Sequence, residues 1–206
     1  MRTELLKYSH YLPPGSFDVL IPICEGLDCS FKVRKKRQTK LGDYRPPQNG
    51  KIAQITVNED LNNYHFLIIF IHELAHHFVW VKYGRKVQAH GAEWKEQFSA
   101  LVERFYYSEI FPKDLQKVVK GLIDKPRASS FADMNLLKAL REYDPIEKRI
   151  TLLEELQYQD LFSLNNGKVF RKLEKRRSRI LCAEVGSKRK YLIHKMAEVT
   201  PLEKPL

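Results

Sequence analysis

Apolar residues are densest between residues 66 and 80, a run interrupted at only four polar positions. Its fifteen residues contain no glycine or proline, which predicts a helix of about four turns, and Gly84 predicts where that helix ends. Residues 58–60, Asn-Glu-Asp, are of the types that begin helices and suit the positive end of the helix dipole. Because this helix is apolar on nearly every side, we expect it to be buried.

Two other patterns occur along the rest of the chain. Residues 31–37, 40–45 and 52–57 are strand-like and separated by turn-forming residues, which predicts two hairpins in a small antiparallel sheet. Apolar residues at helical spacing predict further helices at residues 3–12, 17–24, 92–107, 115–123 and 150–156, and one more that the capping sequence Ser130-x-x-Asp133 would open.

Strand-like alternation returns after Gly167. Residues 169–173, 180–185 and 191–199 predict a C-terminal antiparallel sheet of two or three strands. The expected fold class is therefore α+β, with helices and a small antiparallel sheet in a core at residues 1–126. A helical segment at residues 127–166 completes or links this core, and a small basic β subdomain occupies residues 167–206.

Two histidines inside the apolar run return to one face of the expected helix. His72 and His76 are four positions apart, and Glu73 lies beside them. Two imidazoles so placed can hold a metal ion while the carboxylate faces a water molecule bound to it, which is the H-E-x-x-H arrangement. Burying an ionised carboxylate among unpaired imidazoles costs on the order of several kcal/mol, and a divalent cation removes this cost. The alternative is that the histidines are hydrogen-bonded core residues and the pattern is accidental.

A catalytic zinc ion needs three protein ligands and one open position, so the site requires a third side chain. His90 and Glu93 both lie near the start of the next expected helix, where a chain that reverses after Gly84 would return to the metal. The residues alone leave these two candidates even. His77 lies about 100° around the helix from His76, so we expect it to pack or to support the site from outside.

The spacing of these residues resembles that of a known family. The order His72-Glu-Leu-Ala-His76, Gly84-Arg85 and His90-Gly91-x-x-Trp94-Lys95 is similar to the SprT-like metallopeptidase family, which includes the Spartan proteases that degrade proteins crosslinked to DNA. The upstream sequence Lys40-Leu-Gly42-x-Tyr44, the strand at residues 52–58 and Leu61 fit the same family, so the resemblance spans roughly residues 39–105.

The resemblance implies a zincin-like fold for the core and a single zinc ion (Zn2+) held by His72, His76 and His90, with Glu73 as the general base. It thereby favours His90 over Glu93 as the third ligand. Many members of the family carry a zinc ribbon of two cysteine pairs after the protease core. The corresponding tail here has only Cys182, so a second zinc ion is not expected.

These features together predict a zinc-dependent metallopeptidase that cleaves proteins bound or crosslinked to DNA. A zinc-bound water molecule would lose its proton to Glu73 and attack the peptide carbonyl. The main alternative is a non-proteolytic nucleic-acid-binding or regulatory protein with a structural or idle zinc site, and a second is a zinc hydrolase with another substrate. Glu73 discriminates against the first alternative, since a purely structural site needs no carboxylate beside its histidines.

The net charge of +11 suggests a polyanionic partner, and the excess is concentrated in two stretches. Residues 168–195 contain eleven Lys and Arg against two acidic residues, and residues 32–45 contain seven against one. We expect DNA, single-stranded or bound without sequence preference, to be held through its phosphates. The candidate contacts are Lys35, Lys36, Arg37, Arg176, Arg177, Arg179, Lys188, Arg189 and Lys190.

The remaining composition is that of a globular protein outside the membrane. The first residues lack the apolar core of a signal peptide, and the 66–80 run is too interrupted to span a bilayer. We therefore expect a cytoplasmic location, associated with the nucleoid if the source is bacterial. The three cysteines, Cys24, Cys29 and Cys182, form no C-x-x-C pair and are predicted to be reduced and structural.

Overall fold

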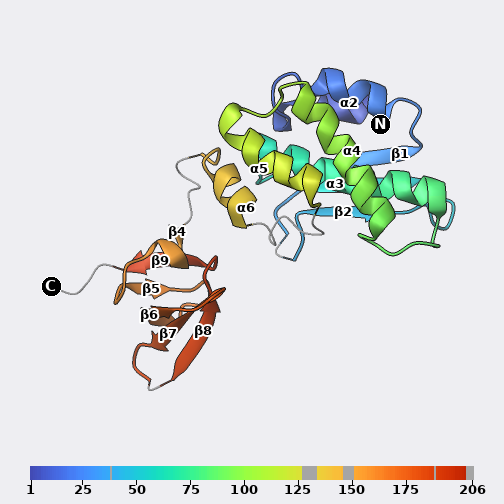
Figure 1. Ribbon diagram of the computed structural model, residues 1–206. Coiled ribbons are helices and arrows are strands. Elements are labelled where there is room, and N and C mark those ends of the chain that lie inside the picture. The colour runs from blue at the N-terminus through green and yellow to red at the C-terminus, as the bar shows by residue number, and fades with distance from the viewer. Residues whose placement is uncertain (38, 127–133, 146–150, 188, 203–206) are drawn as a thin grey trace. The chain divides into compact units, whose positions relative to one another are not determined.

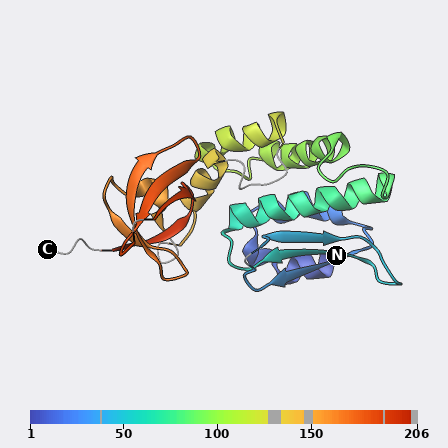
Figure 2. The same ribbon diagram turned by 90° about the horizontal axis from the view of Figure 1, so that it is seen from below.

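The computed structural model describes residues 1–37, 39–126, 134–145, 151–187 and 189–202. The chain divides into two compact units, unit 1 at residues 1–145 and unit 2 at residues 146–206 (Figures 1 and 2). Helices predominate in unit 1 and strands in unit 2, so the predicted α+β class is confirmed. Among the described residues, no helix has the length and apolar character needed to cross a membrane.

Unit 1 contains a three-stranded sheet with the order β1-β3-β2. The central strand β3 (Ala53–Asn58) pairs antiparallel with β2 (Gly42–Arg45) and parallel with β1 (Cys29–Arg34). The prediction of two hairpins is therefore wrong for the first hairpin. Strand β1 does not pair with β2, and the two strands lie on opposite sides of β3. Five of the six β3 residues are buried, and a strand with that much burial belongs in the centre of a sheet.

The apolar run forms α3 (Asn63–Tyr83), which packs on β2 and β3. Eleven of its 21 residues are buried, and the helix ends at Gly84 as predicted. Its N-cap is Asn62 rather than a residue of the 58–60 segment, and the Asn62 side chain accepts a hydrogen bond from the His65 backbone N–H at 3.0 Å. Residues 58–60 are instead the end of β3 and the turn that follows it.

The other helices of unit 1 surround α3. The fourth helix, α4 (Ala92–Tyr107), packs on α3 with its predicted bounds, α5 (Lys113–Asp124) packs on α4, and α6 (Met134–Arg141) packs on α5. The N-terminal segment forms α1 (Arg2–Lys7), a 3-10 turn η1 (Ser9–Tyr11) and α2 (Ser16–Cys24). The predicted capping sequence Ser130-x-x-Asp133 lies outside the described residues.

Unit 2 is a six-stranded antiparallel sheet with the order β4-β9-β5-β6-β7-β8. The sequence predicted only two or three strands, and its last predicted strand is in fact two, β8 (Lys190–His194) and β9 (Glu198–Leu202). Where a helix was expected at residues 150–156, the described part is β4 (Thr151–Leu152) and the 3-10 turn η4 (Leu153–Glu155). The remaining strands are β5 (Leu161–Ser163), β6 (Val169–Lys175) and β7 (Arg179–Glu184).

The boundary between the two units falls between residues 145 and 146 of the sequence, which differs from the predicted boundaries after residues 126 and 166. The difference has a physical cause on each side. The Asn62 side chain donates hydrogen bonds to the Leu140 carbonyl at 2.8 Å and to the Asp144 carboxylate at 2.6 Å, which attaches α6 to unit 1. Strands β4 and β5 pair with β9 and so belong to unit 2.

Candidate metal centre

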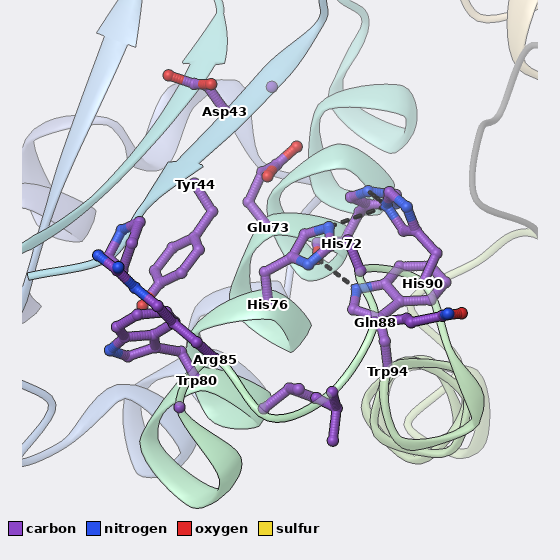
Figure 3. A pocket seen from close by; sticks show the side chains of 16 residues that line it. Asp43, Tyr44, His72, Glu73, His76, Trp80, Arg85, Gln88, His90 and Trp94 are labelled. Carbon is purple, nitrogen blue, oxygen red and sulfur yellow. Dashed lines mark hydrogen bonds between the residues drawn. The ribbon is translucent and has the colours of Figure 1, made fainter.

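Three imidazoles converge in unit 1 (Figure 3). Helix α3 presents His72 and His76 one turn apart, and the loop that leads into α4 brings His90 to them. The His90 Nε2 atom lies 3.0 Å from His76 Nε2 and 3.1 Å from His72 Nε2. Among the described residues these three form the group of potential ligands close enough to hold one metal ion, and Glu93, the other candidate for third ligand, is outside it.

The backbone at His90 is in the left-handed conformation, with φ of 60°. This conformation costs a residue other than glycine about 1 kcal/mol, and such conformations concentrate at functional sites. The following residue, Gly91, donates a backbone hydrogen bond to the Gln88 carbonyl at 3.0 Å, which closes the turn. The turn therefore directs the His90 ring back toward α3.

Trp94 supports the three histidines from α4. Its side chain is 0% exposed, and its ring centroid lies 4.6 Å from that of His72 and 4.7 Å from that of His90. Its Nε1–H donates to the His72 carbonyl at 3.4 Å, and its other side stacks on Phe98 at 4.8 Å. The spacing between His90 and Trp94 thus places a ligand and its packing support one helical turn apart.

The donor set fits a divalent cation such as zinc. Burial lowers the pKa of His72 to about 3 and that of His76 to about 4, and it lowers the pKa of His90 as well, so all three rings are neutral. Neutral imidazole nitrogens are the form that binds metal. Zinc–nitrogen bonds of about 2.0–2.1 Å in a tetrahedral site put two ligand nitrogens roughly 3.3 Å apart, close to the separations seen here.

Glu73 lies beside this group and is 7% exposed. Burial raises its pKa to about 8, the negative charge of Asp43 adds to the increase, and Arg37 and Lys40 oppose it. Strand β2 covers the carboxylate closely: a Cβ atom on Gly42 would collide with Glu73 Oε1 and would lie 2.6 Å from Ile69 Cγ2. Only glycine at position 42 allows the strand and the carboxylate to keep these positions.

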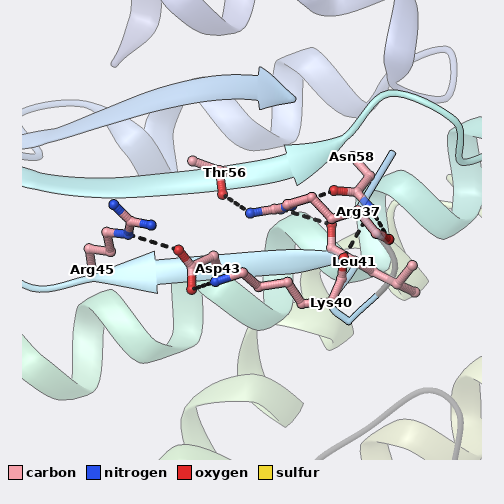
Figure 4. Close-up of polar contacts among 7 residues, drawn as sticks. All are labelled: Arg37, Lys40, Leu41, Asp43, Arg45, Thr56 and Asn58. Carbon is pink, nitrogen blue, oxygen red and sulfur yellow. Dashed lines mark hydrogen bonds and ion pairs between the residues drawn. The ribbon is translucent and has the colours of Figure 1, made fainter. Parts of the chain in front are cut away.

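A set of hydrogen bonds from Arg37 holds the chain around β2 in place (Figure 4). Its guanidinium donates to Asn58 Oδ1 at 2.7 Å, to Thr56 Oγ1 at 3.0 Å and to the Leu41 carbonyl at 3.4 Å. Asn58 is 0% exposed, and its amide donates to the Lys40 carbonyl at 3.0 Å. Arg37, predicted as a nucleic-acid contact, therefore has its guanidinium engaged within unit 1.

His77 points away from the three-histidine group, as its position on the helix indicated. It is 2% exposed, and its Nδ1 atom lies 3.3 Å from the Tyr44 hydroxyl. The Tyr44 ring lies nearly parallel to that of His76, with the centroids 6.4 Å apart. Together these contacts fix Tyr44 as one wall of the site.

The three histidines open into a cleft of about 580 Å³ that follows α3 from His72 to Trp80. One wall is β2 and the residues just after it, and the other is the loop between α3 and α4. The lining residues outside the metal group include Gly42, Asp43, Tyr44, Pro46, Val79, Trp80, Arg85, Val87 and Ala89. The three histidines are therefore accessible from outside unit 1 through this cleft.

The other predicted site residues lie on the surface. Lys35 and Lys36 are exposed beyond the end of β1, and Lys36 Nζ is 3.8 Å from an Asp60 carboxylate oxygen. In unit 2, Arg176, Arg177 and Arg179 lie at the β6–β7 turn, and Arg189 and Lys190 lie at the start of β8. Lys188 is outside the described residues. The three cysteines are buried free thiols.

The sequence predicted no role in the site for Gly42 or Trp80. Gly42 entered only through its family motif, and its contact with Glu73 depends on how β2 crosses α3. Trp80 is four residues after His76, so the same helical spacing that linked the two histidines could have placed it in the cleft.

Comparison with known proteins relates part of this chain to a family. Residues 21–112 match the SprT-like family model. Searches of curated proteins and of solved structures gave no match. The matched segment contains His72, Glu73, His76 and His90, together with the strands that cover them. Residues 21–112 of this chain therefore match a SprT-like domain, and this family suggests a zincin-like domain of the metallopeptidase type.

Proposed function

We propose that the protein is a zinc-dependent metallopeptidase that cleaves proteins bound or crosslinked to DNA. One observation carries the peptidase proposal: three neutral imidazole nitrogens converge at the side of an open cleft, with a buried carboxylate next to them. Three protein ligands is the number typical of catalytic zinc sites, whereas structural sites usually have four.

The residues at this site have separate proposed roles. His72, His76 and His90 would hold the ion, and Trp94 keeps the rings oriented. When bound, zinc supplies Lewis acidity, which polarises a peptide carbonyl and makes water a stronger acid.

Glu73 is the proposed general base. Its carboxylate would accept a proton from the attacking water and later donate it to the leaving amine nitrogen. Burial and the covering strand β2 limit access of other water to this carboxylate. A cation at the three histidines would lower the Glu73 pKa from its metal-free value near 8, so the carboxylate would be ionised before it accepts the proton.

The DNA part of the proposal rests on charge. Arg177, Arg179, Arg189 and Lys190 are exposed in unit 2 and form no ion pair with another described residue. Such cations bind phosphates without reading sequence, so binding would weaken steeply as salt increases. A DNA affinity that stays constant between low and high salt would refute this part.

Cleavage by matched variants tests the peptidase proposal. Wild type, Glu73→Gln and the exposed control Glu96→Gln are incubated with casein or with a DNA-binding protein, with and without single-stranded DNA, and bound zinc is measured in each. We expect cleavage by wild type and by Glu96→Gln, and none by Glu73→Gln although it retains zinc. Equal cleavage by Glu73→Gln would refute the general-base role. A zinc-loaded wild type that cuts neither substrate would favour the non-proteolytic alternative.

A further inference from the structure

We propose that the cleft accepts a large apolar or aromatic side chain of the peptide substrate beside Trp80, one helical turn beyond His76. This inference rests on the proposed peptidase function and specifies the class of substrate. It makes Trp80 a residue that determines specificity rather than one that takes part in bond cleavage.

Trp80 continues the row of residues that faces the cleft. His72, His76 and Trp80 follow one another at intervals of four along α3, so Trp80 lies about 6 Å beyond His76 along the helix axis. In Figure 3, Trp80 and Arg85 lie on the opposite side of His76 from Glu73 and Asp43. The cleft thus has one end at the carboxylate and another at the indole.

The two ends differ in chemistry. At the Glu73 end, Asp43 forms ion pairs with Lys40 at 2.8 Å and with Arg45 at 2.9 Å. The rest of the lining includes five apolar or aromatic residues, Pro46, Val79, Trp80, Val87 and Ala89, together with Arg85 and Gln88.

Two polar side chains of the lining contact neighbouring rings. The Tyr44 hydroxyl is 3.3 Å from His77 Nδ1, and the Arg85 guanidinium lies over the indole at 5.9 Å from its centroid. Trp80 itself is only partly buried. An apolar side chain could therefore cover the open part of the ring without removing a hydrogen bond.

The distance from the histidines suits a residue close to the cleaved bond. An extended peptide advances about 3.3 Å per residue, so a side chain one or two positions from the bond reaches the indole about 6 Å away. Burying a benzyl group rather than a methyl group in such a pocket typically changes kcat/KM by roughly tenfold or more. A lysine or arginine side chain would lose its hydration there and would be repelled by the Arg85 guanidinium, whereas an acidic side chain could pair with that guanidinium.

A set of fluorogenic peptides tests this inference by cleavage. The peptides vary one position at a time among the two residues before and the two residues after the cleaved bond. At the varied position they carry Phe, Leu, Ala or Asp. For wild type we expect kcat/KM about tenfold higher with Phe than with Ala at one position. Trp80→Ala should reduce this ratio to below about threefold, and Trp80→Phe should largely preserve it. The control Val81→Ala, whose side chain is 68% exposed and outside the cleft, should behave as wild type.

Fluorescence provides a readout that does not require cleavage. The chain has two tryptophans, and Trp94 is fully buried, so a peptide seated at Trp80 should change the emission of that residue alone. In zinc-loaded Glu73→Gln, adding the Phe peptide should change the emission, and the additional substitution Trp80→Phe should abolish that change. The Ala peptide should require a roughly tenfold higher concentration.

The outcomes separate this inference from the proposed function. If the Phe peptide alters Trp80 emission but wild type cuts nothing, the peptidase function is refuted and the pocket stands. If wild type cuts Phe, Ala and Asp peptides at equal rates with no change in Trp80 emission, the pocket is refuted and the peptidase function stands. If peptides are neither bound nor cut, both are refuted.

Discussion

The two basic stretches of the chain, residues 32–45 and 168–195, contain similar residues but differ in what their charges contact. In the first, Arg37 is hydrogen-bonded to Asn58 and Thr56, and Lys40 and Arg45 form ion pairs with Asp43. In the second, Lys168 is paired with Glu184 at 3.0 Å. Arg177, Arg179, Arg189 and Lys190 are exposed and have no ion-pair partner among the described residues.

This difference shows that a local excess of positive charge can serve two purposes. Around β2 the cations fix the backbone that covers Glu73, and changing them should affect the site and the stability of unit 1. In unit 2, Arg177, Arg179, Arg189 and Lys190 have no ion-pair partner among the described residues, and changing these four should mainly affect a polyanionic partner. Counting charges along the sequence cannot separate these cases, because it does not show where the side chains end.

The largest effect is expected where β2 contacts the carboxylate of Glu73, the proposed general base. Gly42→Ala would force Glu73 and β2 apart, and a displacement of about 1 Å at a reacting group can reduce kcat about 100-fold. Zinc content should be unchanged, because the atoms nearest an added Cβ belong to Glu73 and Ile69 rather than to the three histidines. The two measurements are kcat with a peptide substrate and the zinc content of the variant.

Gly121→Ala is the matched control for this change. An added Cβ at Gly121, in helix α5, meets no atom within 4 Å, so activity should be retained and stability should rise slightly. Full activity of Gly42→Ala would show that the close fit between β2 and Glu73 has no catalytic role.

A smaller effect is expected from the residue that anchors β2. Arg37→Ala leaves the buried Asn58 oxygen without its donor, which should lower the free energy of unfolding of unit 1 by about 2 kcal/mol. Both tryptophans lie in unit 1, so tryptophan fluorescence during urea denaturation reports on this unit. The exposed Arg34→Ala, which removes the same charge from β1, should change it by less than about 0.5 kcal/mol. Equal destabilisation by the two variants would contradict the structural role of Arg37.

The smallest effect is expected in unit 2. Substituting both Arg177 and Arg179 with alanine should weaken binding of single-stranded DNA roughly fivefold. The slope of the logarithm of affinity against the logarithm of salt concentration should become shallower by about 1.4, or about 0.7 per lost phosphate contact. Fold stability should not change. The measurement is fluorescence anisotropy of a labelled oligonucleotide over a series of salt concentrations.

The control for this change removes the same charge elsewhere. The double substitution of Lys113 and Lys117 with alanine removes two exposed lysines from helix α5 of unit 1. It should lower DNA affinity much less than the change in unit 2. If both double variants lose affinity equally, net charge alone explains binding and the comparison between the two stretches fails.

Local patterns in the sequence predicted the helices that carry the site. Helix α4 was predicted with its observed bounds, and the end of α3 was predicted from Gly84. The periodicity of apolar residues and the conformational freedom of glycine act within a few residues, so they can be read without knowledge of the fold. The same spacing identified His72 and His76, and the structure brings them together with His90.

Pairing between distant segments could not be predicted in this way. Strand β1 pairs with β3 rather than with its neighbour β2, and β4 pairs with β9, almost fifty residues later. Strand β5 has only three residues, too few to show alternation. The choice of His90 over Glu93 likewise depends on the left-handed backbone of His90, which no local pattern indicated.

Zinc titration of wild type, His90→Ala and Glu93→Ala tests most directly the claim that three histidines form the metal centre. With a chromophoric chelator as competitor, wild type and Glu93→Ala should each bind one zinc ion with similar affinity, and His90→Ala should bind it at least about 100-fold more weakly while its circular dichroism spectrum is unchanged. Unchanged zinc affinity and stoichiometry in His90→Ala, with loss in Glu93→Ala, would contradict the account and move the third ligand to Glu93.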